Sequence, residues 1–185
     1  GYSFVSASFF CIYAFHMALF CICSGLVARF NPRKLVTQQL WLYLVGQTLM
    51  LAFRAAVLRE NFAETGGLLA AWLLPWRHIW YLYALIFWHL TLPVLCRLRD
   101  RLGLAGSCLG MALAVGLALA AGLVDWPFTL VRVFAFYPFY AGGVLRRPQL
   151  DRLAAFAAEH RPVRLVAAAG LVLGYGAYFL WVLQA

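Results

Sequence analysis

The amino-acid sequence predicts an all-α protein, folded as a polytopic bundle of about six transmembrane helices. Hydrophobic residues make up 65% of the 185 residues and charged residues only 11%, whereas soluble domains carry about 25% charged residues. One small core cannot bury that much apolar surface, and each Å² left in water costs about 25 cal/mol. Lipid is therefore the expected solvent, and residues 1–185 are expected to form a single transmembrane domain.

The individual helices are placed by apolar stretches and by the polar residues that separate them. A helix rises about 1.5 Å per residue, so about 20 apolar residues cross a hydrocarbon core about 30 Å thick. The expected spans, in chain order, are Phe9–Ala28, Val36–Val57, His78–Cys96, Leu102–Leu123, Phe128–Leu145 and Val163–Leu183.

The arginine and lysine residues between these spans predict how the chain is oriented. They gather in the loops that follow the first, third and fifth spans. These residues are Arg29, Arg33 and Lys34, then Arg97, Arg99 and Arg101, then Arg146, Arg147, Arg152, Arg161 and Arg164. Cytoplasmic loops carry an excess of Lys and Arg, so the three basic loops are expected in the cytoplasm and both ends of the chain outside. This distribution accounts for the net charge of +9 without a nucleic-acid partner, because the basic residues form no single patch.

Two further segments are expected to lie along the membrane instead of crossing it. Residues 67–76 (GLLAAWLLPW) are apolar but too short to span, so an interfacial or re-entrant segment is expected. Residues 146–161 contain LDRLAAFAAEH, which predicts a short amphipathic helix on the cytoplasmic face.

Metal binding and disulfide bonding are not expected from the five cysteines, which lie within or beside apolar stretches. Cys21 and Cys23 are separated by one residue, so on a helix they point about 200° apart. That geometry does not suit a shared metal ion, and the cysteines are interpreted as packing residues.

Polar side chains inside the apolar spans are candidates for function, because polar groups at membrane depth are costly. His16 lies in the first span, with Ser24 further along the same helix. The imidazole either forms a hydrogen bond with a neighbouring helix or acts as a base, and the sequence leaves both open. The second span carries Gln47 and Arg54 on one face.

One face of the third span carries a stripe of His78, Tyr81, Leu85 and His89, spaced three, four and four residues apart. His78, at the external end, could contact a polar acceptor. His89 lies deeper and is interpreted as a packing or hydrogen-bonding residue. Arg132, near the outer end of the fifth span, is interpreted as a snorkelling side chain.

Three segments resemble a known family. The segments IYAFHMALFCICSGLV, HIWYLYALIFW and RVFAFYPFYAGGVLRR resemble, in order and spacing, signature segments of bacterial membrane-bound acyltransferases of the acyltransferase-3 class. The likeness is to the fucose 4-O-acetylase-like branch in particular. It covers most of the chain from Phe10 to Arg147.

The resemblance implies an enzyme of the inner (cytoplasmic) membrane that moves an acyl group, usually acetyl from acetyl-CoA, to a hydroxyl of a sugar or cell-envelope glycan. It implies catalytic roles for His16 and Ser24 in the signature helix. Arg33 and Lys34 match the basic segment expected to bind the donor's phosphates. The segment with His78, Trp80 and Tyr81 is expected on the acceptor side. Acetyl-CoA is expected as a substrate and no bound cofactor is expected.

The chain also departs from the family pattern. Ala18 stands where the signature has proline, and LVTQQLW stands where the next helix opens with L-x-x-P-Y. The family's first helix, which carries the histidine regarded as its base, would precede Gly1, so the chain is expected to be part of a ten-helix domain. The chain is then either inactive alone or a divergent relative with another role. The alternatives are a small membrane transporter and a non-catalytic subunit of a polysaccharide export system.

Overall fold

The computed structural model describes residues 4–59, 62, 67–73, 75, 79–124 and 128–184. All regular secondary structure in these residues is helical, which confirms the predicted all-α class. The elements are α1 (Phe4–Val27), α2 (Pro32–Lys34), the π-helix η1 (Leu35–Leu40), α3 (Trp41–Ala56), α4 (Gly67–Leu73), α5 (Trp80–Gly122), α6 (Phe128–Leu145), α7 (Arg147–Glu159) and α8 (Arg161–Gln184).

The helices follow the apolar stretches of the sequence closely. The ranges Trp80–Gly122 and Arg161–Val182 are long and apolar enough to cross a membrane by length and composition. α1, α6 and η1 with α3 cover three more of the expected spans. α4 and α7 are short helices in the two segments that were expected not to cross, and their position at a membrane surface stays a prediction.

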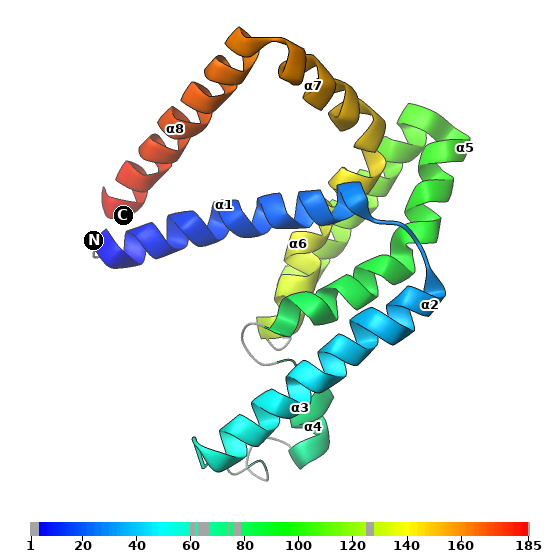
Figure 1. The fold of residues 1–185 in the computed structure, drawn as a ribbon, viewed down its shortest axis with the longest axis vertical. Coiled ribbons are helices and arrows are strands. Elements are labelled where there is room, and N and C mark those ends of the chain that lie inside the picture. Colours follow the sequence, from blue (N-terminus) through cyan, green and yellow to red (C-terminus); the bar gives the residue numbers. More distant parts are fainter. Residues whose placement is uncertain are drawn as a thin grey trace.

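The prediction of a loop between the third and fourth spans is wrong. Helical structure continues through Arg97, Arg99 and Arg101, and the chain reverses at Gly103, whose φ is 57° and ψ is −123°. Only glycine adopts this conformation readily, because it lacks a Cβ. Gly103 therefore makes the turn in place of a loop, and α5 folds back on itself (Figure 1). Beyond the turn, a Cβ at Gly110 would lie 3.7 Å from Leu95 Cδ2, so the two arms pack together.

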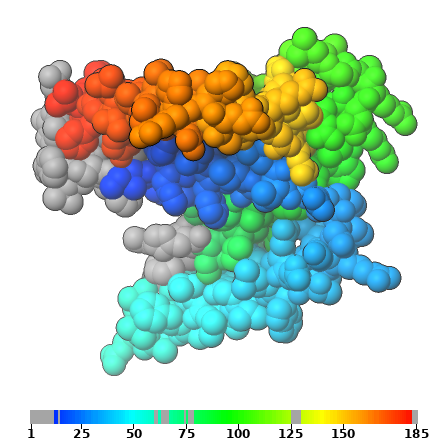
Figure 2. Space-filling model, turned by 45° about the horizontal axis from the view of Figure 1, so that its top comes forward, coloured from blue at the N-terminus to red at the C-terminus, as the bar shows by residue number. Residues whose placement is uncertain are grey.

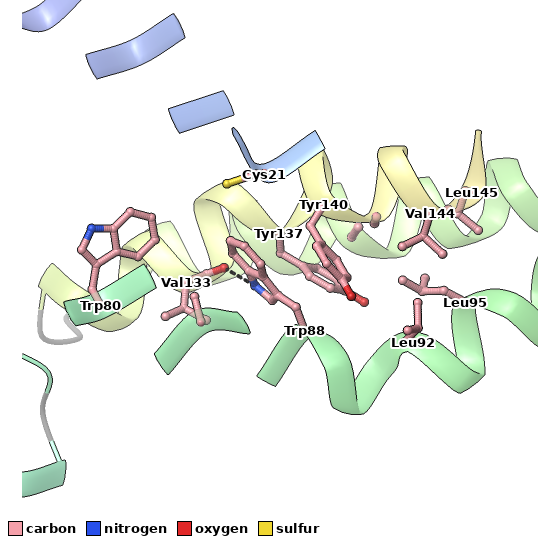
Figure 3. Packing of buried hydrophobic residues seen from close by; sticks show 13 residues of the cluster. Cys21, Trp80, Trp88, Leu92, Leu95, Val133, Tyr137, Tyr140, Val144 and Leu145 are labelled. Atoms are coloured by element: carbon pink, nitrogen blue, oxygen red, sulfur yellow. Dashed lines mark hydrogen bonds between the residues drawn. The ribbon is translucent and has the colours of Figure 1, made fainter. Parts of the chain in front are cut away.

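The core of the molecule lies where α1, α5 and α6 meet. Trp88 and Tyr140 are almost fully buried and their rings lie 5.3 Å apart. Trp88 Nε1 donates a hydrogen bond to Val133 O at 3.0 Å (Figure 3). Tyr137 OH donates to Thr91 Oγ1 at 2.9 Å. These bonds pair the polar atoms of large aromatic side chains that would be costly to bury alone.

The remaining helices extend away from this core. α8 runs back so that its C-terminal end lies near the N-terminal end of α1 (Figure 1), where Phe15 and Tyr175 make an edge-to-face contact at 6.2 Å. α3 lies on the other side of the molecule from α8 (Figure 2). Buried Gln47 on α3 donates to Ala71 O at 2.7 Å, and Tyr43 OH donates to Trp72 O at 3.1 Å, so α4 is held against α3.

Candidate functional site

A cavity of about 360 Å³, with both polar and apolar walls, lies between the C-terminal end of α1, the segment α2–η1 and the first arm of α5. Its wall combines cationic, amide, hydroxyl and imidazole side chains with several aliphatic ones. The lining residues are Ser24, Val27, Ala28, Arg29, Asn31, Lys34, Leu35, Gln38, Gln39, Leu85 and His89.

The cationic part of the cavity is built by a helix start. Asn31 is the N-cap of α2, and its Oδ1 accepts a hydrogen bond from Lys34 N at 3.1 Å. Pro32 fills the first helical position, which suits its fixed φ and missing N–H. This local structure fixes the backbone of Lys34 beside the cavity. Arg33 is exposed and does not line it.

The cations at the cavity have no carboxylate beside them in the part of the chain that the structure describes. Within the described residues, Arg29, Arg33 and Lys34 form no ion pair. Arg99 differs, because its Nε donates to Asp100 Oδ1 at 2.8 Å. That bond holds the pKa of the Asp100 carboxyl below its usual value and raises the pKa of Arg99. The positive charge at the cavity is therefore available to an anion.

The amide part of the cavity comes from the π-helix. Leu35, Gln38 and Gln39 belong to η1 and all line the cavity. Short π-helical stretches are rare and occur often at functional sites. Here the wide turn occupies the segment LVTQQL, at the position where the chain departs from the L-x-x-P-Y pattern.

The imidazole of His89 is held in one orientation. Its Nδ1 lies 2.8 Å from Leu85 O, one turn earlier on α5. A carbonyl oxygen can only accept, so Nδ1 carries the hydrogen and Nε2 carries the lone pair in the neutral ring. Gln39 Nε2 lies 3.5 Å from His89 Nε2, at the long limit for a hydrogen bond. The accepting nitrogen is thus only weakly engaged.

A hydroxyl pair lies further along the same walls. Ser24 Oγ and Tyr81 OH are hydrogen-bonded, which joins α1 to α5. Tyr81, Leu85 and His89 lie on one face of α5, and Leu85 and His89 line the cavity. The stripe seen in the sequence therefore runs from the hydroxyl pair along the cavity wall.

The structure does not bring His16 and Ser24 together. They are eight residues apart on α1, which is about 12 Å along the helix axis. His16 is exposed, stacks on Phe20 at 5.9 Å, and lines a separate, mostly apolar groove of about 990 Å³ between α1 and α8.

The predicted acceptor-side residues have different surroundings. Trp80 is buried in the core against Phe136, and the Arg132 guanidinium lies 5.9 Å from its ring centre. Tyr81 is half-buried and bonded to Ser24. His78 lies outside the described residues.

Metal ligation has no visible basis in this part of the chain, where no three His, Cys, Asp or Glu side chains come together. Cys21 is fully buried in the core, while Cys23 is exposed.

Comparison of the chain with protein-family models, with curated proteins and with solved structures gives no match. The candidate site therefore stands on its own geometry.

Proposed function

We propose that the chain is a multi-pass protein of the bacterial cytoplasmic membrane with about six spans. The exposed surfaces of the helices support this proposal. Large apolar side chains lie open on several helices, including Leu119 at 67%, Val166 at 72% and Leu173 at 73% exposure. Exposure of this apolar surface to water is unfavourable in free energy, whereas its contact with lipid is favourable.

Within this membrane protein we propose an O-acyltransferase that takes an acyl group, most simply acetyl, from acyl-CoA. The observation that carries the proposal is the cavity in which Arg29 and Lys34, free of carboxylate partners among the described residues, adjoin amides and an imidazole. Coenzyme A has anionic phosphates at one end and a thin chain with amide groups leading to the thioester. The cations suit the phosphates, and the amide wall suits the chain.

The acceptor in this proposal is a hydroxyl of a sugar or a cell-envelope glycan. The resemblance of three segments to acyltransferases of the acyltransferase-3 class supports this acceptor class. The donor site is assigned to the predicted cytoplasmic side, since Arg29 and Lys34 belong to the first basic loop.

The test is acetyl-CoA binding to the purified chain in lipid nanodiscs. Lys34→Gln and Arg29→Gln are each expected to weaken binding about tenfold, which corresponds to about 1.4 kcal/mol. Arg152→Gln removes an exposed cation on α7, away from the cavity, and is expected to change the dissociation constant less than about twofold.

An absence of acetyl-CoA binding by the unaltered chain would contradict the proposal, and so would equal losses in all three variants. Substrate flux through liposomes containing the chain would then favour the transporter hypothesis.

A further inference from the structure

We propose that His89 is the general base of this cavity and that Gln39 positions it. The inference rests on the proposed acyltransferase function and deepens it. It differs from the expectation carried by the resemblance, which assigns a catalytic role to His16.

The first argument is the tautomer. A neutral imidazole can take a proton only at the nitrogen that carries no hydrogen. The bond from Nδ1 to Leu85 O, at 2.8 Å, leaves Nε2 as that nitrogen. Such a bond from the second ring nitrogen fixes both the tautomer and the ring orientation. His89 is thus prepared as a base by its own helix.

The second argument is the weak contact on Nε2. Gln39 reaches it at 3.5 Å, while Gln39 Oε1 is buried and has no hydrogen-bond partner among the described residues. A hydroxyl entering the cavity can offer its hydrogen to Nε2 at a shorter distance and replace the long contact. A buried unpaired carbonyl oxygen is costly, so Gln39 also gains from a ligand that donates to it.

The third argument is that His89 lies beside the proposed donor-binding residues. It shares one cavity with Lys34 and Arg29, the groups assigned to the donor's phosphates. His16 lines the separate groove of α1 and α8, and no hydrogen bond holds its ring within the described part of the chain. A base must lie within hydrogen-bond reach of the proton that it removes, which for an acceptor bound beside the donor favours the imidazole that lines the same cavity.

The reaction then balances as follows. The acceptor hydroxyl oxygen attacks the thioester carbonyl carbon, and its proton passes to His89 Nε2. The new C–O bond forms as the C–S bond breaks, and the CoA sulfur leaves as a thiolate. The imidazolium returns the proton to that sulfur, so the products are the ester, free CoA thiol and neutral His89.

The experiment measures two quantities for the chain in nanodiscs: acetyl-CoA binding, and release of CoA thiol in the presence of a membrane glycolipid extract. His89→Gln is expected to lower kcat by about 10²- to 10⁴-fold, the usual contribution of a general base, with acetyl-CoA binding changed less than about twofold. Free imidazole is expected to restore part of the activity of His89→Ala, because it can refill the vacated space.

A matched control is present on α7. His160 Nδ1 lies 2.8 Å from Phe156 O, the same bond within one helix turn, but the ring is exposed and outside the cavity. His160→Gln is therefore expected to leave kcat unchanged. His16→Gln is included as the competing base.

Each result distinguishes the two proposals. Acetyl-CoA binding without thiol release by the unaltered chain would overturn the acyltransferase function, and the role of His89 with it. Full turnover by His89→Gln would overturn the role of His89 and leave the proposed function standing. Equal losses of binding and turnover in His89→Gln would indicate a structural role and also overturn the inference. Failure of the unaltered chain to bind acetyl-CoA would overturn the proposed function, and the role of His89 with it.

Discussion

Two glycines bring the backbones of α1 and α6 together at the residue scale. A Cβ at Gly25 would overlap Tyr140 O, and a Cβ at Gly143 would overlap Ile22 O and lie 3.1 Å from Gly25 Cα. Small residues allow such close approach, and the contact of two backbones leaves no flexible group that can move aside. This crossing lies next to Ser24 and so sets the position of the α1 wall of the cavity.

Gly143→Ala is expected to destabilise the protein by about 1–3 kcal/mol, the range for overpacking a tight contact. The measurement is the thermal unfolding midpoint in detergent. Gly116→Ala is the control, because a Cβ there meets no atom within 4 Å. If both variants unfolded at the same temperature as the unaltered chain, the crossing would not be a close contact.

Only part of the cavity can be predicted from the sequence. The stripe of Tyr81, Leu85 and His89 follows from the helical spacing, but the place of His89 in a cavity depends on η1, which brings Gln39 to it. The π-helical turn could not be predicted, because LVTQQL reads as an ordinary part of an apolar helix. Likewise, the groove that His16 lines depends on where α8 packs, which the sequence of α1 does not contain.

At the scale of elements, the long helix α5 is the frame of the site. Its first arm carries Tyr81 and His89, and its second arm packs back along the first after Gly103. The apolar stretches predicted the helices well, because hydrophobic length determines where a helix is stable. They failed at the reversal, since the charged residues 97–101 continue the helix and the turn itself is made at Gly103.

Gly103→Ala is expected to cost about 1–3 kcal/mol, because a side chain is strained at this positive φ. The measurement is the same unfolding midpoint, again with Gly116→Ala as the control. An unchanged midpoint in Gly103→Ala would show that the reversal does not depend on the glycine conformation.

The attachment of α4 to α3 gives a second prediction at this scale. Gln47→Leu removes the donor to Ala71 O and leaves that carbonyl without its bond from Gln47. Hydrogen exchange of the backbone amides in Gly67–Leu73 is expected to become faster. Thr48→Val removes an exposed bond to Leu44 O within α3 and is expected to leave this exchange unchanged. Equal exchange in both variants would contradict the anchoring role of Gln47.

At the scale of the whole molecule, the account depends on how the chain crosses the membrane. The distribution of basic residues predicts that α7 lies in the cytoplasm and that the segment after α5 lies outside. Leu123 and Gln149 are exposed residues just beyond the two ends of α6. If α6 crosses the membrane, these two residues lie on opposite sides of it.

A membrane-impermeant maleimide applied to intact cells is expected to label Leu123→Cys and not Gln149→Cys, with labelling at each position read by mass spectrometry. Both positions are expected to react after the cells are opened. Labelling of Gln149→Cys in intact cells would contradict the proposed orientation.

The proposed function requires that the cavity beside Lys34 and His89 receives acyl-CoA, and protection by the ligand tests this requirement. Gln38→Cys places a thiol on the exposed part of the cavity wall, and Gln149→Cys places one on α7, outside the cavity. Acetyl-CoA is expected to slow maleimide labelling at position 38 and to leave labelling at position 149 unchanged. Equal labelling at position 38 with and without acetyl-CoA would contradict it.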